Sequence, residues 1–175
     1  GMVVVTTMVA WRARELRPIA ERVRPAVAVV DHRGVTDAEA AFAELAVAPA
    51  VLVSGGDDDA LIRACEAKSG HFTPVDTAAD DVALLGATSG TTGVPKITMH
   101  FHRDILANAD TFARHVLHLT SDDVSASTAP LAFTFGLGGN VVFPLRTGGA
   151  MVLVERATPV LSLIHISEPT RQAEI

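Results

Sequence analysis

The sequence predicts an α/β protein whose sheet or sheets are mostly parallel and flanked by helices. Short apolar runs alternate with longer helical stretches along the 175 residues. This alternation is typical of parallel strands joined by helical crossovers. Apolar residues make up 49% of the chain, which is enough for a buried core, and no internal repeat is visible.

The strands are predicted from short runs rich in valine, isoleucine and leucine, because such side chains suit a pleated, half-buried backbone. The run before Thr88 is almost wholly apolar, and we expect it to be buried. The expected strands are Val3–Thr7, Pro25–Asp31, Pro49–Ser54, Val82–Thr88, Lys96–Phe101, Val124–Thr128 and Ala150–Val154.

The helices are predicted from the longer stretches between these runs. The expected helices are Val9–Val23, Thr36–Ala46, Asp57–Ser69, Asp104–Leu119 and Phe135–Leu145. Pro18 should kink or break the first helix, because proline lacks the N–H that a helix interior needs. Thr36 and Glu39 form a capping-box pattern at the start of the second helix. Gly70 should end the third.

The most informative segment is Thr88-Ser89-Gly90-Thr91-Thr92-Gly93-Val94-Pro95-Lys96, which follows the buried strand. Glycines let a backbone approach phosphate oxygens, and hydroxyls, N–H groups and a lysine ammonium can bind them. The ends of strands are also where α/β sheets bind ligands. The candidate ATP-phosphate-binding residues are Thr88, Ser89, Gly90, Thr91, Thr92, Gly93 and Lys96. The alternative is an ordinary Ser/Thr/Gly surface turn.

This loop is not a Walker loop. That motif places Gly directly before Lys and Ser or Thr directly after it. Here Val94-Pro95 separates Gly93 from Lys96, and Ile97 follows the lysine. Pro95 would also interrupt a loop that must donate N–H groups continuously into a helix.

Thr88–Lys96 resembles the phosphate-loop signature of the adenylate-forming (AMP-binding) superfamily, which includes acyl- and aryl-CoA synthetases, peptide-synthetase adenylation domains and luciferases. Val75–Ala83, Thr98–Asp104 and Pro130–Gly139 resemble its benzoate- and 2-aminobenzoate-CoA ligase branch. The likeness covers roughly Gly1–Pro159. Ile97 departs from the family, which usually has Gly after the lysine. A β-branched residue is acceptable there if Ile97 begins a strand.

The resemblance implies a partial N-terminal domain of an ATP-dependent aryl-acid–CoA ligase. The intact enzyme would convert a benzoate-class or 2-aminobenzoate-class acid and ATP into an acyl-adenylate and pyrophosphate, then form the CoA thioester with Mg²⁺ assisting. Lys96 would be the catalytic residue that stabilises phosphate charge. Two alternatives stay open. One is an adenylation domain that loads a carrier protein, and the other is a non-catalytic phosphate-binding module.

The segment Phe133-Thr134-Phe135-Gly136-Leu137-Gly138-Gly139 resembles the part that lines the acyl pocket in relatives. Phe133 and Gly138 are therefore the candidate substrate-pocket residues, since an apolar ring beside closely packed glycines suits an aryl group. The alternative is that Phe133 and Phe135 are core residues. Asn140, one turn further on, is a candidate to hydrogen-bond a ring substituent.

The histidines and the cysteine do not predict a metal site. His100 and His102 are expected on one face of a strand, where one of them would orient the loop by hydrogen bonds; a metal pair or general base is the alternative. His115 and His118 are expected to be exposed. Cys65, the only cysteine, is expected to be a half-buried structural residue within a helix.

Composition argues against several other classes. A net charge of −6 offers no basic surface for nucleic acid. The apolar runs fall short of the roughly 20 residues that span a bilayer. No signal-peptide pattern precedes the first strand, so a cytoplasmic protein is expected.

The C-terminal residues 161–175 differ from the rest. Leu161–Arg171 can be back-translated codon by codon into a string that resembles a transposon-type sequencing adapter. We therefore expect residues 1–160 to be an internal fragment of the large AMP-binding domain and 161–175 to be a non-native, adapter-encoded tail. The alternative is a genuine strand with a polar terminus.

Overall fold

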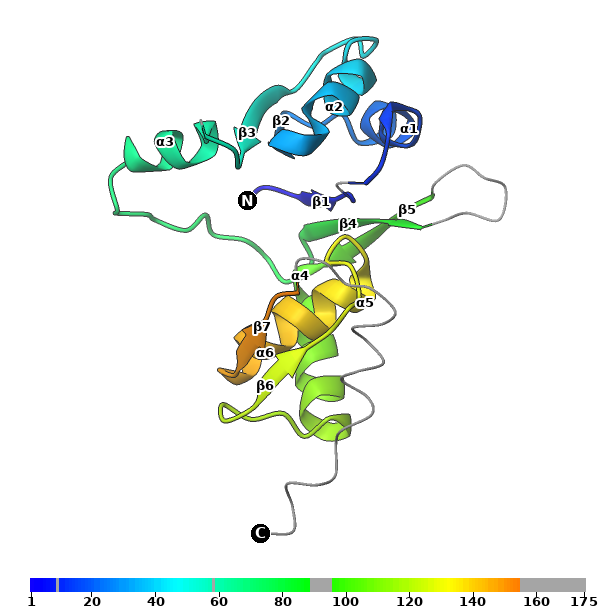
Figure 1. Cartoon of the computed structure of the whole chain (residues 1–175). Coiled ribbons are helices and arrows are strands. Elements are labelled where there is room, and N and C mark those ends of the chain that lie inside the picture. The colour runs from blue at the N-terminus through cyan, green and yellow to red at the C-terminus, as the bar shows by residue number, and fades with distance from the viewer. Residues whose placement is uncertain (9, 58, 89–95, 155–175) are drawn as a thin grey trace. The chain divides into compact units, whose positions relative to one another are not determined.

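The computed structural model describes residues 1–8, 10–57, 59–88 and 96–154. It divides into two units, Gly1–Phe101 and His102–Ile175. Among the described strands, three pairings are parallel and one is antiparallel. The helices alternate with these strands, so the expected α/β class is confirmed (Figure 1).

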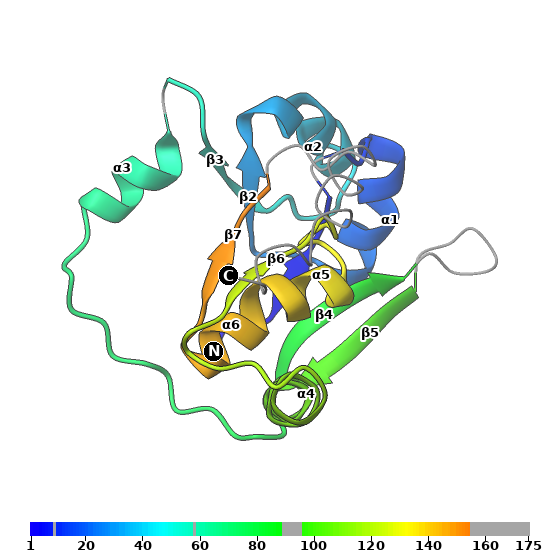
Figure 2. The same cartoon turned by 60° about the horizontal axis from the view of Figure 1, so that its bottom comes forward.

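The first sheet of unit 1 has the strand order β1-β4-β5. β1 (Val4–Thr6) pairs in parallel with β4 (Val82–Thr88), and β4 pairs antiparallel with β5 (Lys96–Phe101). β4 and β5 lie side by side in both views (Figures 1 and 2). Ala83 and Leu84 of β4 are buried, as the apolar run before the loop predicts. This hairpin positions the two ends of the candidate phosphate loop.

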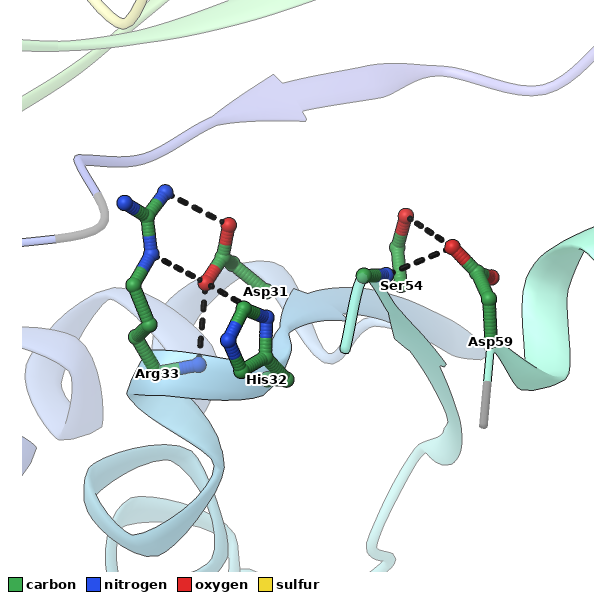
Figure 3. Close-up of polar contacts among 6 residues, drawn as sticks. Asp31, His32, Arg33, Ser54 and Asp59 are labelled. Carbon is green, nitrogen blue, oxygen red and sulfur yellow. Dashed lines mark hydrogen bonds and ion pairs between the residues drawn. The ribbon is translucent and has the colours of Figure 1, made fainter. Parts of the chain in front are cut away.

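The second sheet of unit 1 consists of two parallel strands, β2 (Val27–Asp31) and β3 (Ala50–Ser54). Asp31 and Ser54, the last residues of the two strands, are in register. The carboxyl ends of these strands therefore meet at one edge, which is the edge where polar side chains gather (Figure 3).

Helices α1 (Ala13–Val23) and α2 (Val35–Phe42) pack against each other through small side chains. Ala20, Ala38 and Ala41 are buried at 4% exposure or less, together with Ile19. Alanine lets two helix backbones approach closely. At the start of α1, Asp37 accepts hydrogen bonds from the Arg12 guanidinium at 2.8 Å and from the Ala13 amide at 3.2 Å.

The helix boundaries in unit 1 differ from the sequence prediction. α1 begins at Ala13, not at Val9, and it continues through Pro18, so the proline does not break the helix. α2 begins at Val35 because the 3-10 helix η1 (His32–Gly34) leads directly into it, so Thr36 lies inside the helix and does not cap it. α3 spans only Ala60–Glu66, with the Asp59 carboxylate accepting from the Ile62 amide at 2.9 Å, and it ends before Gly70.

Unit 2 contains two helices that the sequence predicts as continuous and that the structure divides. The first is α4 (His102–Asn108) followed by the π-helix η2 (Ala109–Val116). The second comprises α5 (Thr134–Leu137), the π-helical turn η3 (Gly138–Val142) and α6 (Phe143–Thr147). Two short parallel strands, β6 (Val124–Ala126) and β7 (Ala150–Val152), complete the unit.

The core of unit 2 joins its helices. Ala109, Ala113 and Phe143 are buried together, and the rings of Phe112 and Phe143 lie 6.0 Å apart at a 37° tilt. The Arg146 guanidinium donates two hydrogen bonds, of 2.8 and 2.9 Å, to the Asp110 carboxylate, so α6 is also linked to η2 by an ion pair. No helix among the described residues has the length and apolar character needed to cross a membrane.

Candidate functional site

The β4–β5 hairpin brings the two ends of the predicted phosphate loop together. Thr88 is the last residue of β4, Lys96 is the first of β5, and the two are paired in register. The Thr88 hydroxyl donates to the Lys96 carbonyl at 3.4 Å. The loop residues between them, which include the candidates Ser89, Gly90, Thr91, Thr92 and Gly93, lie outside the described residues.

Lys96 is exposed, and no carboxylate in the described part of the chain forms an ion pair with its ammonium. Ile97 lies in β5, paired with Ala87, where a β-branched side chain suits the extended backbone. The departure from the family at this position is therefore compatible with the strand that follows the loop.

His100 is connected to the same hairpin. The Thr98 hydroxyl donates to the Gly86 carbonyl at 3.1 Å and also lies 3.1 Å from the His100 Nε2 atom. His102 begins α4, so the expectation that the two histidines share one strand is wrong: the chain leaves the sheet after Phe101. His115 and His118 are exposed, as predicted.

Cys65 is exposed, so the predicted half-burial is wrong. Its helix α3 contains no buried residue. Within the described ranges, no three His, Cys, Asp or Glu side chains form a group that could hold a metal ion.

The candidate pocket residues lie at the start of α5 and in η3. Phe133 is the N-terminal flanking residue of α5, and its backbone amide donates to the Pro130 carbonyl at 3.2 Å. Phe133 is 37% exposed and Phe135 is 79% exposed, so neither is a core residue in this structure. A Cβ atom built on Gly138 would lie 3.6 Å from the Phe143 ring, in ordinary contact.

Gly136 is a position that sequence reasoning does not single out. A Cβ atom on this buried residue would lie 2.1 Å from the Pro130 carbonyl oxygen and 2.8 Å from that of Ala129. Only glycine lets these backbone carbonyls approach the helix so closely. The Ala129–Phe133 loop is thereby held against α5 and η3. The sequence signal is a glycine inside a predicted helix, which is otherwise unfavourable.

A second polar cluster occupies the ends of β2 and β3 (Figure 3). The Arg33 guanidinium donates to both Asp31 carboxylate oxygens, at 2.8 and 2.9 Å, and lowers the pKa of that carboxyl well below its ordinary value of 3.8. The Gly55 amide donates to Asp59 at 2.6 Å and is the main cause of the lowered pKa of Asp59. Since both pKa values are lowered, any stability they contribute is lost as the pH falls below the ordinary carboxyl range. Each of the two carboxylates thus accepts its hydrogen bonds from neighbouring residues of the cluster, and we interpret the cluster as structural.

The family follows from a comparison with known sequences. The profile of AMP-binding enzymes matches residues 1–170, so this chain belongs to the AMP-binding enzyme family. It is 38% identical over 110 residues to the benzoate–CoA ligase of Thauera aromatica, covering 62% of this chain and 21% of that protein. It is 40% identical over 91 residues to the p-hydroxybenzoic acid–AMP ligase of Mycobacterium tuberculosis, covering 52% of this chain and 13% of that protein.

Solved structures agree with the family and with the fold. The crystal structure of the anthranilate CoA ligase AuaEII with anthranoyl-AMP superposes with a TM-score of 0.85 at 26% identity, covering 93% of this chain and 32% of that one. The ATP-bound MatB of Rhodopseudomonas palustris superposes with a TM-score of 0.81 at 28% identity, covering 96% of this chain and 33% of that one. The chain thus spans about a third of these structures, and the matched parts cover 21% and 13% of the two curated relatives.

Proposed function

We propose that this chain is the part of an AMP-forming aryl-acid–CoA ligase that holds the ATP phosphates and one wall of the aryl pocket. The observation that carries the proposal is the in-register pairing of Thr88 with Lys96, which is exposed and has no ion-pair partner in the described part of the chain, at the loop end of the β4–β5 hairpin. The intervening hydroxyls and glycines (Ser89, Gly90, Thr91, Thr92 and Gly93) would complete the phosphate contacts. The names of the aromatic-acid relatives support the substrate class.

The chemistry divides into two steps. The acid carboxylate attacks the α-phosphorus of ATP, the bond to the leaving oxygen breaks, and pyrophosphate departs. The CoA thiol then replaces AMP at the acyl carbon. The transition state of the first step spreads negative charge over phosphoryl oxygens, so donors and a cation placed beforehand stabilise it. From this chain, Lys96 would supply the cation, and the Thr88 hydroxyl, which donates to the Lys96 carbonyl here, would turn to a phosphate oxygen; ATP with Mg²⁺ and CoA would be the co-substrates of the intact enzyme.

The domain assignment belongs to the same proposal. Residues 1–160 would be a fragment of the large AMP-binding domain, and 161–175, which lie outside the described residues, an adapter-encoded tail. The family profile extends to residue 170, ten residues into this segment, so the proposed boundary rests on the back-translated sequence alone. We place the intact enzyme in the cytoplasm, where ATP and CoA are available. A carrier-loading adenylation domain would use the same first step, but it would transfer the acyl group to a carrier-bound thiol in place of CoA.

The proposal is tested by comparing the 175-residue chain with the full-length enzyme that contains it. Full-length protein should form the thioester from benzoate, 2-aminobenzoate or 4-hydroxybenzoate with ATP and CoA. The chain alone should form none, because it matches only about a third of the related structures. Acid-dependent exchange of pyrophosphate into ATP, run beside thioester formation, separates the two steps. Exchange without CoA thioester would favour the carrier-loading alternative, and no exchange with any acid would contradict the proposal.

A test of the pocket wall uses Phe133. Phe133→Ala in the full-length enzyme should raise KM for the aromatic acid and relax selectivity toward bulkier acids, while KM for ATP changes little. The shift should be graded, because one methylene of pocket volume changes discrimination by only about 1–3 kcal/mol. Since the side chain is 37% exposed here, the melting temperature should fall by less than it would on truncation of a fully buried phenylalanine. A large loss of stability with an unchanged order of substrates would remove Phe133 from the pocket.

A further inference from the structure

Asn140 is a buried side chain with an unused hydrogen-bond acceptor. The residue is 3% exposed. Its Nδ2 atom donates to the Ala129 carbonyl at 3.2 Å, while its Oδ1 atom is buried and has no partner among the described residues. A buried acceptor without a donor costs about 1–3 kcal/mol, so proteins rarely keep one without a use for it.

The orientation of this amide follows from its hydrogen bond to the Ala129 carbonyl. A backbone carbonyl can only accept, so the atom of Asn140 that faces Ala129 must be the amide nitrogen. Exchanging the two atoms would set two acceptors against each other and lose the bond. The unpartnered atom is therefore an acceptor, and what it lacks is a donor.

The position of Asn140 connects it with the candidate pocket wall. Asn140 lies four residues after Gly136, on the same face of the continuous helical segment, and both approach the Ala129 carbonyl. Phe133 is held at the other end of the same loop through Pro130. Asn140 also lies in a π-helical turn, an irregularity often found at functional sites. The loop Ala129–Phe133 thus connects Asn140, whose Oδ1 atom has no partner among the described residues, with the candidate pocket residue Phe133.

We propose that Asn140 Oδ1 accepts a hydrogen bond from an amino or hydroxyl substituent on the ring of the aromatic acid, and that the enzyme selects acids carrying such a donor. The inference rests on the proposed function. An unsubstituted benzoate presents only C–H groups and leaves the acceptor unpaired. An N–H or O–H group at the matching ring position pairs with it, and a methyl group of similar size cannot.

The first experiment needs no substitution. The kcat/KM of the full-length enzyme is measured for 2-aminobenzoate against 2-methylbenzoate, and for 4-hydroxybenzoate against 4-methylbenzoate. In at least one pair the donor-bearing acid should be preferred by about 10- to 100-fold, the size expected when a buried acceptor is left unpaired. The pair that shows the preference identifies the ring position. Equal use of both members in both pairs overturns the inference.

The second experiment removes the acceptor. Asn140→Leu should bring the preference in that pair to near one, because the leucine accepts no hydrogen bond and fills a similar volume. If the leucine variant does not fold, Asn140→Ala should likewise bring the kcat/KM preference in that pair to near one. Thr147→Val is the matched control: it removes a partly buried hydroxyl that donates to the Phe143 carbonyl in the same unit, and it should leave the preference unchanged.

The outcomes separate this inference from the proposed function. An enzyme that activates the acids but keeps its preference without Asn140 contradicts the inference alone. An enzyme that activates none of the acids contradicts the proposed function, and the inference with it. A general loss of stability lowers turnover on both members of a pair and leaves their ratio unchanged, so it cannot imitate the expected result.

Discussion

Replacing Lys96 with alanine in the full-length enzyme should slow adenylation by about one to three orders of magnitude, the size expected when one charge-stabilising donor is lost. Lys96 lies at the mouth of the β4–β5 hairpin, and its ammonium has no ion-pair partner in the described part of the chain. The loss should appear in acid-dependent exchange of pyrophosphate into ATP. Thioester formation from preformed aryl-adenylate and CoA should be spared, because that step no longer involves the β- and γ-phosphates.

Lys68 provides the control for this prediction, since it is the other lysine of the chain and is also exposed. Lys68→Ala makes the same change in net charge far along the sequence from the loop, and it should leave both steps at the unaltered rate. Equal losses in the two steps for Lys96→Ala would instead assign Lys96 a structural role in the hairpin. An effect of similar size for Lys68→Ala would point to the overall charge of the protein.

The hairpin illustrates what could be predicted from the sequence. The apolar run that ends at Thr88 and the β-branched residues after Lys96 follow the physical rule for strands, and both strands lie where the pattern places them. The use of Thr88 and Lys96 for phosphate stays a prediction, because the residues between them lie outside the described part. The resemblance to the family, now shown by the match over residues 1–170, is what gives that prediction its chemistry.

The helices show why other features could not be predicted. The stretch Asp104–Leu119 has a helical pattern, but apolar periodicity over so few residues does not distinguish α-helical from π-helical turns, so η2 is not visible in it. The cap predicted at Thr36 fails because η1 already provides the first turn before α2. The burial and orientation of the Asn140 amide depend on its hydrogen bond to the Ala129 carbonyl, eleven residues earlier in the sequence. A contact of this kind leaves no local pattern in the sequence.

Gly136→Ala should destabilise the full-length enzyme by about 1–3 kcal/mol or more, the cost of forcing an extra methyl group into a packed site. Its Cβ atom would lie 2.1 Å from the Pro130 carbonyl oxygen, which is backbone and cannot turn aside as a side chain can. The Ala129–Phe133 loop must then move away from α5. Thermal melting should show the loss of stability. Steady-state kinetics should show a raised KM for the aromatic acid with little change in KM for ATP.

Gly139 makes this prediction a comparison between two like substitutions. It lies three residues further along the same helical segment, and a Cβ atom there would meet nothing within 4 Å. Gly139→Ala should therefore leave stability unchanged or raise it by up to about 1 kcal/mol, because alanine favours helix and restricts the unfolded chain. Replacing glycine with alanine raises helix propensity at both positions. The expected difference in stability between the two variants therefore comes from the Pro130 carbonyl, which lies close to Gly136 and not to Gly139. If the two variants melt at the same temperature, the Ala129–Phe133 loop is not held against the helix at Gly136. The proposed placement of Phe133 and Asn140 by this loop would then be contradicted.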